Sequence, residues 1–270
     1  MSKTILTQEQ EKEIIYKYSI LGISKNKLKE EYRVSEGTIK RALIRNNIAL
    51  RSIQETNKTK YEINHHFFNL KNQTADSNYI LGLLASDGWV GAKDNCICIE
   101  LQQEDRQILE DINQILKNSR PVKDYIRTNG FKNCKLYFFS KEIKNDLKEY
   151  DIIPNKTYQQ LNFTKNIRFI SSFIRGFFDG DGSITSANGG IRWQLDGTSK
   201  ETFLSIQVFF KENYQIDLTL VETTDESCTI PRYRLYTYGR EKCKKIFDIL
   251  YEDANLKLNR KYNKFLELLK

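Results

Sequence analysis

The chain has 270 residues, of which 39% are hydrophobic and 29% are charged, and its 43 lysines and arginines exceed its 35 aspartates and glutamates. This composition is typical of a globular protein and excludes a disordered chain, and no apolar run has the roughly 20 residues that a transmembrane helix needs. The formal net charge of +8, together with 15 Tyr and 15 Phe, favours a nucleic-acid partner.

The cysteine and histidine pattern gives no sign of a disulfide framework or a zinc site. The number of cysteines is odd, and the two histidines adjoin each other; these residues are Cys96, Cys98, Cys134, Cys228, Cys243, His65 and His66. We therefore expect reduced thiols. The N-terminal segment MSKTILTQEQEKEI has no signal-peptide core, so we expect a cytoplasmic protein, in the interior of a bacterium, a phage-infected cell or an organelle.

Residues 1–52 predict three short helices in a helix-turn-helix arrangement. Ser24 can cap a helix over KNKLKEEY and Ser35 can cap one over EGTIKRALIRN, with the tight RVS turn between them. In such a fold the third helix enters the major groove of DNA. Its exposed face offers Thr38, Lys40, Arg41 and Arg45. The alternative is a solvated basic helix in a small structural bundle.

A polar segment and then an internal repeat follow. The stretch SIQETNKTKYEIN predicts a linker over residues 53–75. Beyond it, ILGLLASDGWV at 80–90 matches IRGFFDGDGSI at 174–184, and KLYFFSKE matches RLYTYGRE downstream. The sequence therefore predicts two repeats, over residues 76–165 and 166–270.

Each repeat has the pattern of helix, strands, helix, strands and helix. In the strands, apolar residues such as Ile97, Ile99 and Trp193 alternate with polar ones. This indicates antiparallel sheets with helices on one face and a free polar face. The predicted fold class is α+β, with two pseudo-symmetric αββαββα repeats and saddle-shaped sheets. The free faces should meet bases in the major groove through Glu100, Gln102, Lys135, Tyr137, Arg192, Gln194, Arg232, Arg234 and Tyr236.

The repeated helices each end on an aspartate. Small residues within them, such as Gly82 and Gly176, would let the two helix backbones approach closely. Pairing the helices would bring Asp87 and Asp181 together at the negative ends of two helix dipoles. Two such carboxylates repel each other, and a bound cation would relieve the repulsion. Hard oxygen ligands in an aqueous cleft suit Mg²⁺. The alternative is a pair of ordinary Asp-Gly turns.

These two stretches also carry a resemblance to a known family. ILGLLASDG and IRGFFDGDG resemble the signature motifs of the LAGLIDADG homing endonucleases in their single-chain, two-repeat form. The resemblance implies that Asp87 and Asp181 bind divalent metal, with Ca²⁺ or Mn²⁺ as substitutes for Mg²⁺, and that the backbone carbonyls of Ser86 and Gly180 assist them. Ala85 stands where the family usually has its first aspartate, whose counterpart is Asp179, an interface residue rather than a third ligand.

The resemblance also implies residues that order water and neutralise the scissile phosphate. Lys156 and Lys261 fit the family's lysine positions, and Gln103 fits its glutamine position, with Gln102 one step away. The second repeat has Gly197 there, so the two half-sites would differ chemically. The alternative for both lysines is a solvated surface residue.

The expected function is site-specific, Mg²⁺-dependent cleavage of both strands of a long asymmetric DNA duplex by a monomer, as in intron homing. One alternative is a DNA-binding regulator that no longer cuts. Another is a maturase that binds intron RNA, although a helix-turn-helix favours duplex DNA. A recombinase is the weakest alternative, because no nucleophilic Ser or Tyr in a basic cluster is marked.

Overall fold

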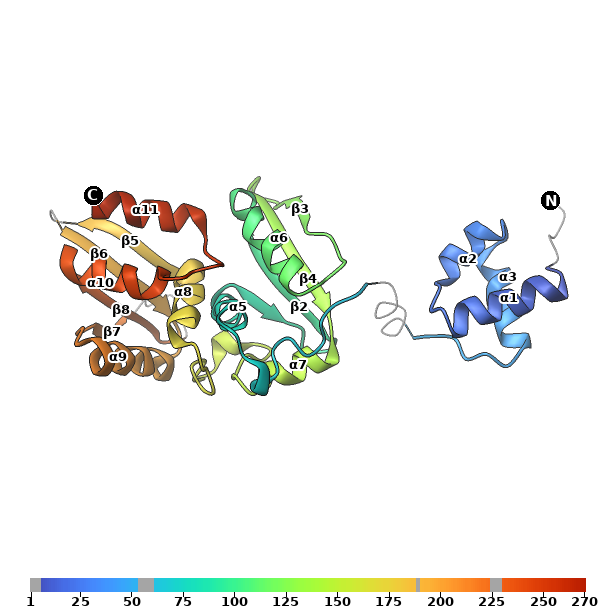
Figure 1. Ribbon diagram of the computed structural model, residues 1–270, viewed down its shortest axis with the longest axis horizontal. Helices are drawn as coiled ribbons and strands as arrows, with labels where there is room; N and C mark the ends of the chain where they lie inside the picture. Colours follow the sequence, from blue (N-terminus) through green and yellow to red (C-terminus); the bar gives the residue numbers. More distant parts are fainter. Residues whose placement is uncertain (1–5, 53–60, 188–189, 224–229) are drawn as a thin grey trace. The chain divides into compact units, whose positions relative to one another are not determined.

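The computed structural model describes residues 6–52, 61–187, 190–223 and 230–270 (Figure 1). The chain divides into two compact units, a smaller one that ends at Glu62 and a larger one that begins at Ile63. None of the helices in the described part combines the length and apolar character needed to cross a bilayer.

The smaller unit is a bundle of three helices around its own apolar core. Their bounds are α1 Gln8–Ser19, α2 Lys25–Glu31 and α3 Glu36–Arg45. Both predicted caps are present, because the Ser24 hydroxyl accepts from the Lys27 amide and the Ser35 hydroxyl from the Thr38 amide. The core consists of Leu6, Ile14, Tyr18, Leu28, Ile39, Ala42 and Leu43.

Arg51 ties the end of the smaller unit back to its first helix. Its guanidinium lies 3.9 Å from the centre of the Tyr18 ring and donates hydrogen bonds to the carbonyls of Gly22 (2.7 Å) and Ile23 (3.0 Å). The Arg51 amide also donates to the Tyr18 hydroxyl at 2.8 Å. These contacts hold the chain against the α1–α2 turn as it leaves α3.

The larger unit contains two repeats of the same αββαββα order. The first comprises α5 Ala75–Ser86, β1 Gly88–Val90, β2 Cys96–Gln102, α6 Arg106–Ile115, β3 Lys123–Ile126, β4 Lys132–Phe139 and α7 Lys141–Lys148. The second comprises α8 Ile170–Asp181, β5 Gly182–Ala187, β6 Gly190–Gly197, α9 Lys200–Tyr214, β7 Thr219–Thr223, β8 Arg232–Tyr238 and α10 Arg240–Tyr251, followed by α11 Asn259–Leu269. Short 3₁₀ turns lie at η1 Leu70–Asn72, η2 Gln103–Asp105 and η3 Lys156–Tyr158.

Each repeat forms an antiparallel sheet of four strands, and the two sheets have the same topology. The strand orders are β1-β2-β4-β3 and β5-β6-β8-β7. The central strands alternate as predicted: Ile97, Ile99 and Leu101 are buried, whereas Cys98 and Glu100 are only partly buried. Helices α6 and α9 contact the strands of their own repeats. The predicted α+β fold with two repeats is thus confirmed.

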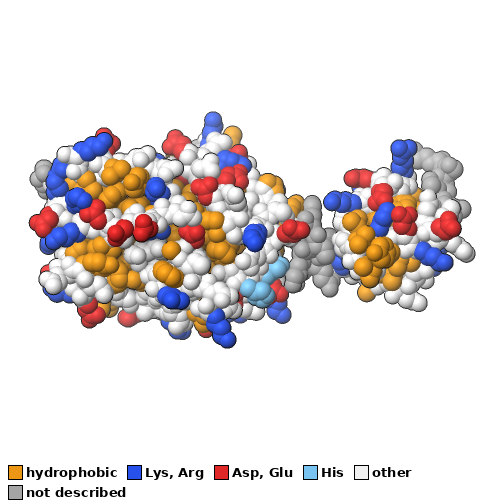
Figure 2. Space-filling view, viewed as in Figure 1, with side chains coloured by type: hydrophobic (Ala, Val, Ile, Leu, Met, Phe, Trp, Pro, Cys, Tyr) orange, Lys and Arg blue, Asp and Glu red, His pale blue; other side chains and the backbone are white. Residues whose placement is uncertain are grey.

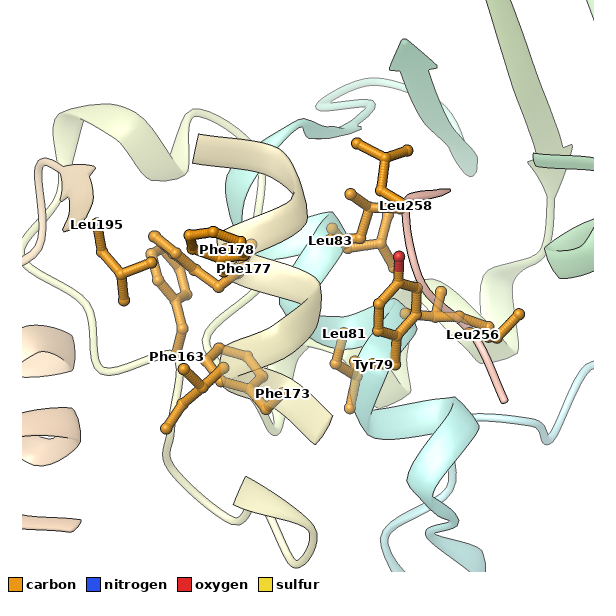
Figure 3. Close-up of a cluster of buried hydrophobic side chains, with 14 of the residues drawn as sticks. Tyr79, Leu81, Leu83, Phe163, Phe173, Phe177, Phe178, Leu195, Leu256 and Leu258 are labelled. Atoms are coloured by element: carbon orange, nitrogen blue, oxygen red, sulfur yellow. The ribbon is translucent and has the colours of Figure 1, made fainter. Parts of the chain in front are cut away.

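Helices α5 and α8 pack side by side at the centre of the larger unit (Figure 1). A Cβ atom on Gly82 would lie 2.0 Å from the Phe173 carbonyl oxygen, and one on Gly176 would lie 1.9 Å from the Tyr79 carbonyl oxygen. The helices therefore meet backbone to backbone, as the small residues predict. Apolar side chains from both repeats surround this contact (Figure 3).

The sequence predicts a linker over residues 53–75, but from Ile63 onward this segment is part of the larger unit. Phe68 is 1% exposed within the core, and the Tyr150 hydroxyl donates to its carbonyl at 3.0 Å. The Asn64 amide likewise donates to the Leu116 carbonyl at 2.9 Å. Most of this segment is polar, which favours a linker, but two adjacent aromatic residues within it, Phe67 and Phe68, anchor it to the core of the larger unit. Residues 53–60 lie outside the described part of the chain.

Candidate metal site and nucleic-acid interface

The packing of α5 against α8 brings the two motif aspartates together. Asp87 is the C-cap residue directly after α5, and Asp181 is the last residue of α8. A Cβ atom on Gly180 would lie 3.1 Å from Oδ2 of Asp87, so the Asp87 carboxylate lies directly beside the end of the opposite helix. Glycine at position 180 is what leaves room for this approach.

Both aspartates are exposed residues, but the surrounding protein removes part of the hydration of their carboxylates. Burial and, second, the Asp181 charge together raise the pKa of Asp87 to about 6, against the opposing charges of Lys261 and Lys156. Burial also raises the pKa of Asp181, which Lys156 and then Lys261 lower. The protein therefore holds two acidic groups whose negative charges are incompletely compensated.

Two lysines close the C-terminal ends of the motif helices. Lys156 Nζ donates to the carbonyls of Gly88 (2.6 Å) and Ser86 (3.3 Å). Lys261 Nζ donates to the carbonyls of Phe178 (2.8 Å), Gly180 (2.7 Å) and Gly182 (2.7 Å). These bonds satisfy carbonyls that a helix end leaves without intrahelical partners. Neither lysine is a solvated surface residue.

Burial of the two ammonium groups changes their acidity. Burial lowers the pKa of Lys261 to about 8, against the charges of Asp179 and Asp87. Burial also lowers the pKa of Lys156, against the charges of Asp181 and Asp87. Each lysine thus couples to a carboxylate of the opposite repeat as well as to its own helix end.

A small cavity of about 80 Å³ joins Lys156 to the opposite repeat. Lys156 and Ser86 line it from the first repeat, and Asp181 and Gly197 line it from the second. The cavity can hold a few water molecules beside Asp181. No side chain projects from Gly197, which stands where the first repeat has Gln103.

The donor set fits a hard divalent cation. The described residues contain no cluster of three or more His, Cys, Asp or Glu side chains that could hold a metal. The available oxygen donors are the two carboxylates and the carbonyls of Ser86 and Gly180, each of which keeps a second lone pair besides the one that a lysine uses. A site with few protein oxygens and room for water suits Mg²⁺.

Asp179 lies in a buried network, apart from the solvent-reaching edges of the other two aspartates. It is 2% exposed, and its Oδ2 accepts from the Tyr79 hydroxyl (2.7 Å) and the Leu258 amide (2.8 Å). The Tyr251 hydroxyl donates to its Oδ1 at 3.4 Å. Asp179 thus ties α5 to the segment before α11, which agrees with an interface role. Sequence reasoning missed Tyr79, although it directly precedes the first motif.

The open face of the first sheet forms a groove of about 850 Å³, and Asp87 is one of its lining residues. Of the predicted DNA-binding residues, Glu100, Lys135 and Tyr137 line it. The groove also has residues that sequence reasoning missed, namely Trp89, Lys123, Asp124, Tyr125 and Arg127. Lys123, Asp124 and Tyr125 lie in the short, mostly exposed strand β3, and Arg127 directly follows it; the alternation of so short a strand is too brief to mark it in the sequence.

Basic side chains lie over tyrosine rings in and beside this groove. Lys135 lies 4.6 Å from the Tyr125 ring centre, and Arg120 lies 4.7 Å from that of Tyr137. The Glu100 carboxylate accepts from Arg127 Nε at 3.0 Å. The predicted Gln102 is the exposed last residue of β2, and Gln103 is exposed in η2.

The open face of the second sheet carries a similar arrangement. The Arg192 guanidinium lies 4.5 Å from the Tyr236 ring centre, and Arg234 Nε donates to Asp196 at 2.8 Å. Gln194 is 9% exposed and donates to the same aspartate. Arg232 is exposed at the start of β8. These five predicted residues share two paired strands, β6 and β8.

In the smaller unit, the predicted DNA-binding residues of α3 differ in their exposure and in their contacts with neighbouring side chains. Lys40 and Arg41 are exposed. The Thr38 hydroxyl lies 2.9 Å from the Ser35 hydroxyl, and Arg45 pairs with Glu11 of α1. Figure 2 shows that basic, acidic and hydrophobic side chains intermingle on the visible face of each unit, so the positive charge is not gathered into one patch there.

Comparison with known families agrees with this geometry. The family model described as LAGLIDADG-like domain matches residues 74–156 and again residues 168–250. The chain therefore belongs to the LAGLIDADG-like domain family and contains two copies of the domain. An uncharacterized protein of Methanocaldococcus jannaschii is 28% identical over 148 residues, which are 54% of this chain and 54% of that protein. The chain spans about half the length of this curated relative.

Solved structures with a similar fold include nucleases bound to DNA. The homing endonuclease I-WcaI bound to its DNA recognition sequence is 10% identical, with 72% of this chain and 90% of that chain covered and a TM-score of 0.48. I-DmoI in complex with DNA and Ca is 14% identical, with 72% and 97% covered and a TM-score of 0.46. The N-terminal LAGLIDADG domain of DUF199/WhiA is 15% identical, with 75% and 94% covered and a TM-score of 0.44.

Proposed function

We propose that this protein is a site-specific endonuclease that cuts both strands of a DNA duplex with the help of a divalent cation, Mg²⁺ foremost. The observation that carries the proposal is the pair of carboxylates, Asp87 and Asp181, at the adjoining ends of two tightly packed helices. Family membership supports it, as do the groove of charged and aromatic side chains that Asp87 helps to line and the lysines at both helix ends.

The residues of the chain divide the work as follows. Asp87 and Asp181, with the carbonyls of Ser86 and Gly180, would hold the cation. When bound, the cation supplies an activated water and stabilises charge on the leaving oxygen. Lys156 and Lys261 fix the helix ends that present the carboxylates, and their positive charge partly neutralises the approaching phosphate.

The open faces of the two sheets would read the DNA sequence. Arginine and lysine side chains held over tyrosine rings, as for Arg192 and Lys135, keep polar edges free for base edges and phosphates. The smaller unit would add contacts on one flank through Lys40 and Arg41 of α3. Because one chain supplies both half-sites, we propose that a monomer acts on an asymmetric target.

The test is selection followed by cleavage. Duplexes bound in Ca²⁺ are recovered from a randomised library, sequenced and then exposed to Mg²⁺. We expect double-strand breaks at a unique sequence. The double variant Asp87→Asn/Asp181→Asn should bind the same sequence and make no breaks.

A matched control separates this result from a general loss of charge. Asp248→Asn removes an exposed carboxylate on α10 that pairs with Lys244, and it should cut like the unmodified protein. Breaks that persist in the double aspartate variant would contradict the proposed roles of the carboxylates.

A second candidate function is sequence-specific DNA binding without cleavage. One observation favours it: the Ser86 and Gly180 carbonyls, which the metal would use, already accept hydrogen bonds from lysines. Tight binding of one selected sequence, with no breaks in Mg²⁺ or Mn²⁺, would decide for this function. Preference for a folded intron RNA over every selected duplex would instead indicate a maturase.

A further inference from the structure

Each motif lysine lies in a segment that crosses to the other repeat. We call residues 156–163 the Lys156 segment and residues 256–261 the Lys261 segment. In Figure 3, Phe163 of the first lies beside Phe177 of α8, and Leu256 and Leu258 of the second lie near Tyr79 of α5. Each segment therefore contacts the helix of one repeat and the body of the other.

The Lys156 segment docks on the start of α9 through neutral hydrogen bonds. The Thr202 hydroxyl accepts from the Phe163 amide at 2.9 Å, and the Gln160 side chain donates to the Thr198 carbonyl at 3.1 Å. Ser199, which caps α9, donates to the Leu161 carbonyl.

The Lys261 segment docks on the start of α6 through an ion pair instead. Arg260 Nη2 lies 2.9 Å and Nε 3.3 Å from the two carboxylate oxygens of Asp105. Asp105 is the residue before α6, yet its side chain makes no capping bond to that helix. Its side chain is 5% exposed, whereas that of Arg260 is 45% exposed. The buried carboxylate is thus committed to Arg260.

This ion pair lies next to the Asp87 half of the site. Lys261 follows Arg260 directly and donates to the Gly180 carbonyl, and Gly180 adjoins the Asp87 carboxylate. The Asp105 charge also acts on Asp87, whose pKa it raises slightly. The Arg260 guanidinium therefore fixes the first turn of α11 to the first repeat while Lys261 fixes it to the second.

We propose that Arg260 and Asp105 form a positioning pair that holds Lys261 beside Asp87, so that the half-site of one DNA strand is assembled from both repeats. Correspondingly, Gln160 and Ser199 position Lys156 beside Asp181. This inference rests on the proposed nuclease function. It predicts that loss of either contact slows one strand selectively.

The first experiment resolves the two strands. The selected duplex carries a different fluorophore on each strand, and nicking of each is followed in Mg²⁺. Arg260→Gln should slow the strand that Asp87→Asn fails to cut by roughly 10- to 100-fold relative to the other strand, because small displacements of positioning groups have effects of this size. Arg260→Lys keeps the positive charge but loses the two-point contact with the Asp105 carboxylate. It should therefore restore the rate only in part, to roughly threefold to 10-fold below that of the unmodified protein.

Two further variants and two controls complete the test. Asp105→Asn combined with Arg260→Gln avoids an unpaired buried charge and should be no slower than Arg260→Gln alone, since coupled residues are not additive. Gln160→Ala should slow the opposite strand. Lys244→Gln on α10 should slow neither, and melting temperatures confirm that every variant is folded. Equal slowing of both strands by Arg260→Gln would overturn the proposal.

The second experiment needs no cleavage and so separates this inference from the proposed function. Lys261 and Lys156 of the free protein are reductively methylated, and their modification rates are compared by mass spectrometry. Arg260→Gln should raise the rate at Lys261 about 10-fold and leave Lys156 unchanged, because three carbonyl bonds protect Lys261 only while its segment is fixed. An unchanged rate at Lys261 would overturn the proposal, even if the unmodified protein cuts no DNA.

Discussion

The two repeats share a backbone plan but surround their aspartates differently. Both have the same strand order and a glycine at the helix contact. The first repeat follows its central strand with Gln103 and the buried Asp105, whereas the second has Gly197 and Ser199 there. Packing therefore fixes the backbone in both repeats, and the side chains near each carboxylate are free to differ. Equal geometry does not imply equal chemistry.

The largest effect should come from removing one carboxylate at a time. Asp87→Asn and Asp181→Asn should each slow double-strand cleavage on the order of 10³-fold, because each removes a metal ligand. If the halves act separately, each variant still nicks one strand, and the strand differs between them. A supercoiled plasmid carrying the selected site measures this as nicked against linear product. Complete loss of nicking in both variants would show that the halves share one catalytic unit.

The next largest effect should be a loss of stability when the glycine that each repeat has at the helix contact is replaced. Gly82→Ala and Gly176→Ala each place a Cβ atom about 2 Å from a carbonyl oxygen of the facing helix. Each should lower the free energy of unfolding by about 3 kcal/mol, because the backbones must separate. Thermal unfolding followed by circular dichroism measures this.

Gly37→Ala is the matched control for the glycine variants. It changes another helical glycine, where the nearest atom outside the helix backbone is Ser35 Oγ at 3.7 Å. It should stabilise α3 by up to about 1 kcal/mol, because alanine favours helix over glycine. If only one of Gly82→Ala and Gly176→Ala strongly lowers the stability, the helix contact would be less able to adjust on that side than on the other.

A smaller effect should appear in the dependence of stability on pH without divalent cation. The pKa of Asp87 is about 6 in the folded protein against an ordinary 3.8, so the folded state holds the proton more tightly. The free energy of unfolding should therefore fall as pH rises from about 4 to about 6. Asp87→Asn should remove about 1 kcal/mol of that fall, a value reduced for solvent screening at a partly exposed group. Urea unfolding at several pH values measures the slope, and an unchanged slope in the variant would contradict the raised pKa.

The smallest effect should come from making the first half resemble the second. Gln103→Gly removes the exposed side chain in η2 that Gly197 lacks. It should slow cleavage of the DNA strand that the Asp87 half-site cuts by roughly threefold to 10-fold. This is the low end of the rate contribution expected from a group that orders water. The strand-resolved assay then reports more nearly equal rates. An unchanged rate on the strand that the Asp87 half cuts would mean that Gln103 does not act on that half.

The sequence was sufficient for the fold because the repeat and the strand alternation are local signals. The motif aspartates could also be placed, since glycines at matching positions predict the helix contact. Contacts between distant segments left no such signal. Nothing in the order of residues pairs Asp105 with Arg260, or Asp179 with Tyr79, because these contacts arise only when two segments cross. Similarly, the position of each lysine was predictable, but the carbonyls that it bonds were not.

The contact between α5 and α8 has a consequence for recombination of such chains. Where the helices touch at Gly82 and Gly176, the contact is made by main-chain atoms. The main chain of a helix has the same shape whatever its sequence. A repeat taken from a different protein could therefore pack in the same register, provided that it has glycine at the position of Gly82 or Gly176. The restrictions on such a chimera lie in the apolar side chains that surround the contact and in the crossing polar contacts, above all Tyr79 with Asp179. A hybrid that carries those residues along with its half would inherit a working junction.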